Sequence, residues 1–400
     1  MPGGEVSNMP AGTLGATAVD THELRAFVEE VFEPLQRADQ RRWAHAYLGA
    51  LLSVPGKKTL QRLAKAVSPA PAAAHGLQQF INASPWDWGP VRRSLARAVA
   101  TQGLPRAWTV AELTIPKRGV HSVGVHRRFD TDLGRTVNCQ LAIGLFLAAE
   151  VGCVPVNWSL LLEESWCADE KRRSRARIPA SVTARPTWRH ILDFASDVSA
   201  TPSLSGIPWA LDLRRTADAG AVMEGLARRG LDFVCEVGAA EPVLPAFGVA
   251  PAAGLGEWMA RSHPRQPQVV VRQAVTGRLE RLAVHCGEVR LPGRAGEPSG
   301  GPRVYRALAR PVAVGRPGAR YWITSLADWR AEEVLALARH ATAGEAAVRD
   351  LGHFGVQDFE GRSYPGWHHH MTMASAAHAF TRLTARDRVM ALTVPDSVCA

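Results

Sequence analysis

The sequence predicts an α/β protein: a mixed sheet flanked by helices, with an all-helical unit before it and a β-rich insertion within it. Apolar residues recur at helical spacing near the start of the chain, as at Leu24, Phe27, Val28 and Val31. After Ala107 the pattern changes to short apolar runs typical of strands. Strand and helix signals then alternate, which is the pattern of α/β units.

These patterns divide the chain into five parts. Residues 1–20 are polar and rich in Gly and Pro, as is typical of a disordered leader. The stretch between about 240 and 320 is dense in Pro and Gly but contains alternating apolar runs, which indicates an inserted β structure. The expected order is a leader (1–20), a helical unit (21–104), an α/β unit in two parts (105–240 and 320–384) divided by the insertion (241–319), and a C-terminal tail (385–400).

Within the α/β unit, individual elements follow from local patterns. The segment 219–229 has a helical pattern and is followed by Gly230, a common helix terminator. Asp212 comes directly after a short apolar strand, so its carboxylate is expected at a strand end. The expected strands are 108–110, 122–125, 138–147, 208–211, 231–237, 269–274, 279–285 and 321–324, and the expected helices are 188–198, 219–229, 331–351 and 371–383.

Composition favours a soluble protein with a polyanionic partner. A hydrophobic share of 46% with 21% charged residues is that of an ordinary globular protein, and the longest apolar stretch, 141–156, is interrupted by Glu150. We therefore expect no membrane span, and six scattered cysteines indicate reduced thiols in the cytoplasm. The net charge of +10 favours nucleic acid, although a GC-rich gene also yields many arginines.

Basic residues gather on the expected helices of the N-terminal unit. A helix face of this kind can contact phosphates, and it can also simply be solvated. We interpret the unit as a DNA-binding head, with Lys57, Lys58, Arg62, Arg92 and Arg93 as its contact residues.

Five blocks of sequence, in order along the chain, resemble the conserved blocks of the DDE transposases of bacterial insertion sequences. The resemblance is closest to the insertion sequence seven-hundred-and-one-like group, which is distantly related to the Tn-five-like enzymes. One block would be a weak signal, whereas five collinear blocks are a strong one. They are LQQFINASPW at 77–86, KRGVHSVGV at 117–125, NCQLA at 138–142, the stretch from Asn157 through Arg172 and Arg173 to Pro179, and DFEGRSYPGWHHHMT at 358–372.

This resemblance implies a fold, a chemistry and a partner. Such enzymes place three carboxylates on an RNase H-like sheet, where they hold two divalent cations, Mg²⁺ or Mn²⁺, if the protein is active. The metals promote in-line displacement at phosphorus, so the implied substrate is insertion-sequence DNA ends. Family members act as dimers, which implies a homodimer here.

The first carboxylate of the implied triad is missing. In the family, an aspartate precedes a lysine and a glycine at fixed spacing; Lys117 and Gly119 set that register and place Ala111 at the aspartate position. A methyl group cannot bind a metal. Glu112 is adjacent, but on an ideal strand it points to the opposite face, so it could substitute only through a bulge or a shift.

The other two carboxylates can be carried over. Asp212 matches the second ligand and Glu345 the third, so these two are the implied metal ligands; Glu360 is a rival acidic residue. Arg214 and Arg215 stand where the family has a Tyr-Gly turn, and Ala341 replaces an arginine expected to contact phosphate. The family blocks also imply DNA contacts by Lys117, Arg118, Arg349 and Arg362.

Three consecutive histidines, His368, His369 and His370, raise the alternative of a metal site. Adjacent residues on a helix point about 100° apart, so the three cannot all chelate one ion. We interpret them as packing and polar groups.

Three functions stay open on the sequence alone. The chain is a working transposase that uses Glu112, a DNA-binding homologue without catalysis, or a folded remnant with neither activity. Because Ala111, Ala341 and a missing lysine after Glu345 all fall at the site while the framework blocks persist, we favour a DNA-binding family member with impaired catalysis.

Overall fold

The computed structural model describes residues 20–130, 134–248, 250–262, 267–273, 279–293, 303–311 and 318–393. The expected leader 1–20 lies outside this part of the chain except for Asp20, and so do the last seven residues of the expected tail. Among the described residues, no helix combines the length and the apolar character needed to cross a membrane.

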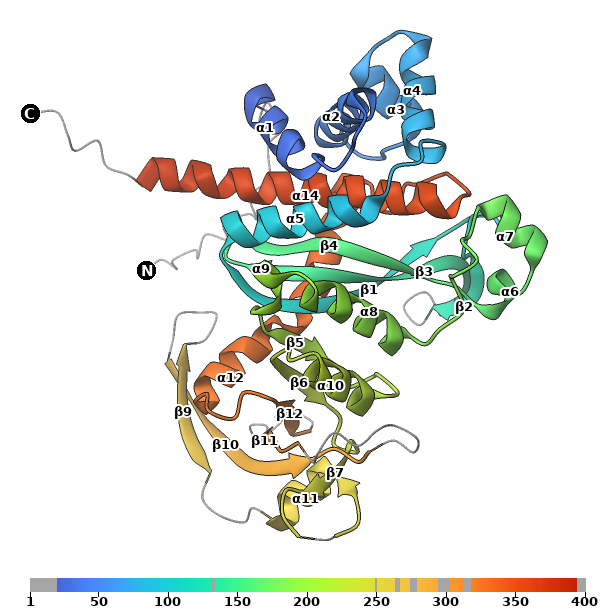
Figure 1. The fold of residues 1–400 in the computed structure, drawn as a ribbon. Helices are drawn as coiled ribbons and strands as arrows, with labels where there is room; N and C mark the ends of the chain where they lie inside the picture. The colour runs from blue at the N-terminus through green and yellow to red at the C-terminus, as the bar shows by residue number, and fades with distance from the viewer. Residues whose placement is uncertain are drawn as a thin grey trace, which may run out of the picture.

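The N-terminal helices form as the apolar spacing predicts. Side-chain oxygens of Asp20, Thr59 and Asp87 accept hydrogen bonds from backbone N–H groups in the first turns of α1, α3 and α5, and so cap them. The apolar faces of these helices meet in one core (Figure 1). The helices are α1 (Thr21–Val31), α2 (Ala38–Ser53), α3 (Leu60–Val67), α4 (Pro71–Asn82) and α5 (Trp88–Gly103).

The C-terminal helix α14 (Tyr364–Thr393) lies under this helical group and is almost entirely buried up to Leu383. It packs against α1, α2, α4, α5 and the edge strand β4 (Gly152–Leu161) (Figure 1). The sequence placed this helix at 371–383; it is longer at both ends and continues to Thr393, inside the segment expected to be a tail.

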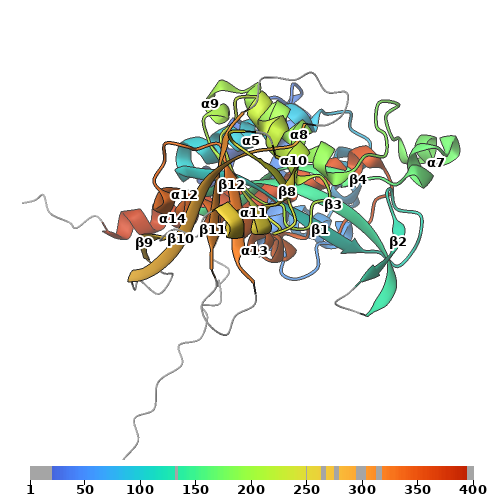
Figure 2. The same cartoon turned by 90° about the horizontal axis from the view of Figure 1, so that it is seen from below.

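A twelve-stranded sheet runs through the rest of the molecule (Figures 1 and 2). Its first strands, β1 (Pro105–Pro116), β3 (Arg135–Ala149) and β4, form an antiparallel meander, and β2 (His126–Asp130) pairs with β3 at its outer end. Next to β1 lie β5 (Trp209–Asp212) and β6 (Phe233–Val237), both parallel to it.

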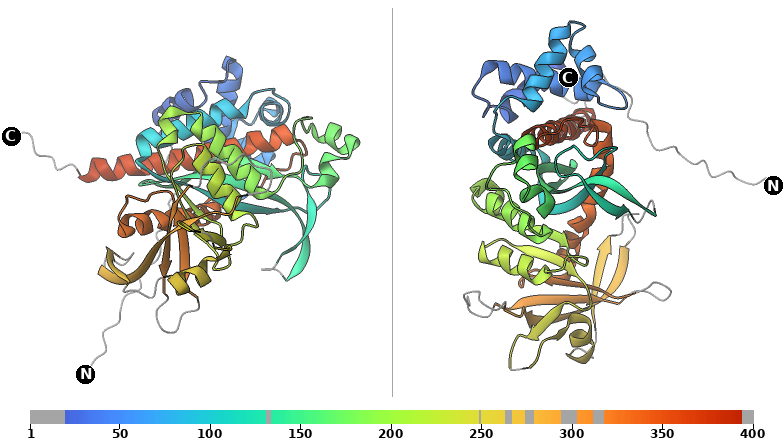
Figure 3. Two further views of the ribbon diagram at one scale, coloured as in Figure 1. Left: turned by 60° about the horizontal axis from the view of Figure 1, so that its bottom comes forward. Right: turned by 90° about the vertical axis from the view of Figure 1, so that its right-hand side faces the viewer.

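The order β4-β3-β1-β5-β6, with three antiparallel strands followed by two parallel ones, is RNase H-like. This confirms the expected fold class, a mixed sheet flanked by helices. The described strands of the segment 241–319 extend the same sheet beyond β6 (Figure 3). Its members are β7 (Pro242–Pro245), β8 (Ala253–Gly254), α11 (Leu255–Ser262), β9 (Gln268–Gln273), β10 (Leu279–Arg290) and β11 (Tyr305–Arg310), and β12 (Arg320–Thr324) joins them to β6.

Helices cover the two faces of the sheet with separate cores. On one face Trp108 and Trp209 pack together, with ring centroids 6.3 Å apart, under α8 (Thr187–Ser199), α9 (Pro202–Ser205) and α10 (Ala219–Arg228). On the other face Ala210 and Val234 pack under α12 (Ala331–Ala338). The short helices α6 (Glu164–Cys167) and α7 (Glu170–Ala176) lie beyond the far end of the meander.

The segment expected as one helix, 331–351, is divided. After α12 the chain tightens into a 3₁₀ turn, η1 (Arg339–Thr342), resumes as α13 (Ala343–Asp350) and ends in a second 3₁₀ turn, η2 (Leu351–Phe354). The Thr109 hydroxyl of β1 donates a 2.9 Å hydrogen bond to the Ala341 carbonyl, which ties η1 to the sheet. The strand expected at 122–125 is also wrong: those residues form a turn, and the strand begins at His126.

Candidate functional site

Strand register brings three positions together on one face of the sheet. Trp108 of β1 is level with Trp209 of β5, so three residues further along both parallel strands Ala111 comes level with Asp212. Asp212 is in turn paired with Glu236 of β6. Side chains at the same level of parallel neighbours share a face, so Ala111, Asp212 and Glu236 form a row across the sheet.

Helix α13 lies directly over this row. A Cβ added to Gly344 would be 3.0 Å from the Ala111 Cβ and 3.3 Å from Phe146, so the helix backbone approaches the strand as closely as glycine allows. Ala111 is buried beneath it. Glu345, the third acidic residue implied by the sequence, follows Gly344, so its backbone lies at the edge of the same row.

Arg214 fills the space between the carboxylates. Its guanidinium donates to both oxygens of Asp212, from Nε at 2.9 Å and Nη2 at 2.5 Å, and its Nε lies 3.6 Å from Glu236 Oε1. The backbone N–H of Arg214 also donates to Asp212 Oδ1 at 3.1 Å, which fixes the turn after β5. Both carboxylate oxygens of Asp212, the second implied metal ligand, are therefore bound by Arg214.

Glu236 is a fully buried carboxylate on β6. Arg320, at the start of β12, binds it with two charge-assisted hydrogen bonds, at 2.7 and 2.5 Å. The Arg320 guanidinium also lies over the Trp322 ring, 5.0 Å from its centroid. Two arginines thus neutralise a charge that would be very costly to bury alone.

The pKa shifts agree with this arrangement. Burial favours the neutral form of Asp212, but hydrogen bonds and charge from Arg214 outweigh it and lower the pKa of Asp212. The hydrogen bonds to Asp212 likewise raise the pKa of Arg214, with smaller contributions from the charges of Glu236 and Glu345. Both sides of the Asp212–Arg214 pair therefore stay ionised at neutral pH, while Glu345 is exposed on α13.

The other two candidate acids lie elsewhere. Pairing of β1 with β3 is regular from Ala107 to Pro116, so there is no bulge to bring the exposed Glu112 to the face of Ala111. Glu360 is exposed on the segment before α14, where its carboxylate lies 3.5 Å from Lys57 Nζ.

This donor set does not fit the two-cation site that the resemblance implies. The first ligand position holds a methyl group, Asp212 has both oxygens engaged by Arg214, and Glu236 is held by Arg320. Within the described part of the chain, no three His, Cys, Asp or Glu side chains are arranged to hold a metal ion. No catalytic step through a metal follows from this geometry.

Most of the basic residues expected to contact DNA lie on the surface. Arg118 follows β1 at the outer end of the meander, and Arg349 lies on α13 one turn after Glu345. Lys117 is half-buried and donates to the Phe359 carbonyl at 2.7 Å; burial lowers its pKa to about 8. The exposed members of the expected set are Lys57, Arg62, Arg93, Arg118, Arg349 and Arg362.

Lys58 and Arg92 do not face solvent, and the expectation that they contact DNA is wrong for both. Lys58 is 5% exposed; its ammonium donates to the Val54 carbonyl and its backbone N–H to Asp358. Arg92 is 3% exposed. Helical spacing predicts which side chains share a face, but it cannot show that distant segments cover them. Helix α14 covers Arg92, and the turn before α14 covers Lys58, which itself lies ahead of α3.

Arg92 joins three elements inside the protein. Its guanidinium donates to Asn157 Oδ1 (2.9 Å) and the Trp158 carbonyl (2.8 Å) of β4, and to the Thr372 hydroxyl (2.8 Å) and the His368 carbonyl (2.9 Å) of α14. Burial lowers the pKa of Arg92 to about 9, so it remains charged at neutral pH.

The three consecutive histidines point in different directions, as their helical spacing requires. His368 stacks on Trp88, with ring centroids 4.5 Å apart. His369 Nδ1 lies 2.8 Å from the Ile81 carbonyl, and His370 Nε2 donates to the Gly355 carbonyl at 2.8 Å. All three are buried and bind protein groups, in keeping with a role in packing.

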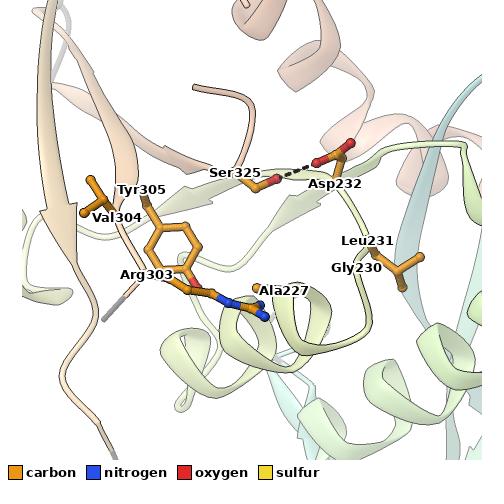
Figure 4. Close-up of a pocket in the computed structure, with 8 residues that line it drawn as sticks. All are labelled: Ala227, Gly230, Leu231, Asp232, Arg303, Val304, Tyr305 and Ser325. Atoms are coloured by element: carbon orange, nitrogen blue, oxygen red, sulfur yellow. Dashed lines mark hydrogen bonds between the residues drawn. The ribbon is translucent and has the colours of Figure 1, made fainter. Parts of the chain in front are cut away.

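A shallow cavity of about 290 Å³ lies at the opposite end of β6 from Glu236 (Figure 4). Tyr305 and Arg303 form one side, and the Ser325 hydroxyl donates to Asp232 at 3.2 Å on the other. The length of β6 separates the cavity from the row of Ala111, Asp212 and Glu236, so the cavity takes no part in the candidate site.

The sequence reasoning missed Glu236, Arg320 and the pairing role of Arg214. One signal was present: Glu236 is the only charged residue in the apolar strand 233–237, and a charge in a buried strand needs a partner. Arg320 had no such signal, because its pairing depends on β12 returning beside β6 after more than eighty residues.

Comparison with known proteins identifies the family. A family model described as DDE superfamily endonuclease matches residues 30–320, which is more than half of the chain. The match includes Ala111 and Asp212 and ends before Glu345. No curated protein matches the chain. The collinear match and the RNase H-like strand order agree, and the chain belongs to the DDE superfamily endonuclease family.

Proposed function

We propose that this protein is a DNA-binding relative of the enzymes that cut and join insertion-sequence DNA ends, and that its own catalysis is impaired. The impaired catalysis is inferred from the side chains at positions 111 and 212. Ala111 takes the place of one carboxylate under Gly344, and Asp212 is chelated by Arg214. A two-cation mechanism needs both positions free to bind metal.

DNA binding is supported by charge and by family. The net charge is +10, and six of the expected contact residues are exposed. We assign Lys57, Arg62 and Arg93 on the helical unit 21–104, and Arg118, Arg349 and Arg362 on the α/β part, to this contact. A homodimer, a cytoplasmic location and membership of the insertion sequence seven-hundred-and-one-like group remain expectations from the resemblance.

The first test is a salt titration of binding. Fluorescence anisotropy with a labelled 40-base-pair duplex from the flanks of the gene, at salt concentrations from 50 to 200 mM, should show a steep loss of affinity. If about six phosphates are contacted, the affinity falls about 10³-fold over this range. Replacing Arg118 and Arg349 by alanine should make the dependence shallower. Absence of binding at 50 mM salt would overturn the proposal in favour of a folded remnant.

The second test is a nicking assay with supercoiled plasmid and Mg²⁺ or Mn²⁺. We expect no conversion to the nicked form by the unmodified chain, and none by Ala111→Asp alone, because Arg214 still holds Asp212 and α13 still covers position 111. Metal-dependent nicking by the unmodified chain that disappears in Glu112→Gln would instead identify a working transposase that uses Glu112.

A further inference from the structure

The outer end of the meander forms a two-stranded arm, made of β2 and the first residues of β3, 135–139. The base of the arm is anchored, because Trp166 Nε1 donates to the Val125 carbonyl at 2.9 Å and Gln140 Nε2 to the Val123 carbonyl at 2.7 Å. Beyond this base, the substantial contacts of β2 with the described elements are with β3 alone, and the arm projects from the body (Figures 2 and 3). The end of the arm is therefore open to a partner.

One face of the arm continues the face of the sheet that holds Ala111. Every second residue of β3 shares a face, so Thr136 lies on the face of Gly144, which is level with Ala111. Thr136 is level with Phe129 of β2, and Arg127, two residues before Phe129, shares that face. Eight residues of β3 separate Thr136 from Gly144, which is about 26 Å of extended strand. A DNA duplex that followed the strand would cover about eight base pairs over this length.

Phe129 is 59% exposed and belongs to neither apolar core. Single exposed apolar side chains are common, so exposure alone has little meaning. Here, however, the exposed ring follows two exposed arginines, Arg127 and Arg128, on a projecting arm. The described residues on the Phe129 face of the arm include no acid, since Asp130 is in register with Arg135 and belongs to the alternate set. An aromatic ring next to a guanidinium suits a partner that offers both phosphates and flat apolar faces.

The arm is also continuous with a residue already assigned to DNA. The backbone N–H of Lys117 donates to the Asn138 carbonyl at 2.8 Å, and Asn138 is level with Arg127. Arg118, the exposed residue that follows Lys117, therefore lies beside the base of the arm. A nucleic acid bound at Arg118 needs only to extend outward to reach Arg127 and then Phe129.

The chemistry of the two side chains indicates which form of DNA they bind. A guanidinium binds a phosphate through charge-assisted hydrogen bonds. A phenyl ring has no donor or acceptor, so it contacts a base through the face of the base, which is accessible where the duplex is open. We propose that the Arg127–Phe129 face of the arm binds DNA at an opened stretch, with Arg127 on a phosphate and Phe129 stacked on an unpaired base. This inference rests on the DNA binding in the proposed function.

The test compares two labelled duplexes of about 40 base pairs, one fully paired and one with about eight mismatched pairs at its centre, by fluorescence anisotropy at about 50 mM salt. The unmodified protein should bind the mismatched duplex more tightly. Phe129→Ala should weaken binding to the mismatched duplex by about tenfold and should change binding to the paired duplex by less than about twofold. Phe129→Trp keeps the stacking surface and should retain the preference.

Two controls locate the contact on this face. Phe247 is 78% exposed between β7 and β8, away from the arm, so Phe247→Ala should bind both duplexes as the unmodified protein does. Arg127→Ala should weaken binding to both duplexes and reduce the slope of log affinity against log salt by about one. Arg128→Ala, on the opposite face of β2, should leave the slope unchanged. Equal losses for the two arginine variants would overturn the assignment to one face.

The remaining outcomes separate this inference from the proposed function. If the unmodified protein and Phe129→Ala bind both duplexes with the same affinity, the inference is overturned while DNA binding stands. If neither duplex is bound, the proposed function fails, and the inference fails with it. Analytical ultracentrifugation of both proteins tests the other occupant, a second copy of the chain. A dimer that dissociates in Phe129→Ala, with the preference for the mismatched duplex unchanged, would also overturn the inference.

Discussion

Replacing Arg92 by methionine is expected to lower the free energy of unfolding by about 3 kcal/mol. The methionine fills much of the same space but removes the hydrogen bonds that Arg92 donates to the Trp158 and His368 carbonyls and to the Thr372 hydroxyl, in a region closed to water. Each such loss costs about 1–3 kcal/mol, partly offset because a buried charge is removed at the same time.

The matched control is Arg93→Met. Arg93 is the next residue on the same helix, has the same charge and is exposed, so this change should stay within about 0.5 kcal/mol of the parent. Urea unfolding followed by circular dichroism measures both variants. Equal stabilities for the two would contradict the assignment of Arg92 as the link between α5, β4 and α14.

The second large effect is expected at Gly355, where alanine should cost about 3 kcal/mol. The residue has φ +72°, which disfavours a side chain, and its added Cβ would lie 2.4 Å from Lys58 Cγ and 2.6 Å from Lys58 Cβ. Lys58 cannot move easily because it is buried and is bound at both its backbone and its ammonium.

Two further glycines separate the causes of that loss. Gly230 has φ +68° with open space around it, so Gly230→Ala reports the backbone strain alone, about 1 kcal/mol. Gly352 is in the same turn as Gly355 but has open space, so its alanine variant should be nearly neutral. The same unfolding measurement applies to all three. A loss at Gly355 no larger than that at Gly230 would contradict the close packing on Lys58.

The sequence predicted the fold class and the strand–helix–strand run at 208–237. Short apolar runs ending at Asp212, and a helix followed by a strand after it, are local signals, and local signals suffice for a parallel strand–helix–strand unit. The placement of Ala111 at the aspartate position came from the resemblance, through Lys117 and Gly119, and stays a prediction; the register of Trp108 with Trp209 is compatible with it.

What the sequence missed depends on contacts between distant segments. The helix expected at 331–351 breaks at η1, where Thr109 binds the Ala341 carbonyl from more than two hundred residues away. Arg92 and Lys58 had the spacing of an exposed basic face, yet α14 and the turn before it cover them. Charge pairing in the acidic row likewise links β5, β6 and β12, which no local pattern connects.

The position of α14 has a consequence for how the protein is made. This helix is the last of the described elements, yet it packs into the core shared by α1, α2, α4 and α5. The first hundred residues therefore leave the ribosome without the partner that covers their apolar faces, until the buried part of α14, residues 364–383, has also been translated. Contacts across so long a sequence separation slow folding and keep apolar surface of the nascent segment exposed in the meantime.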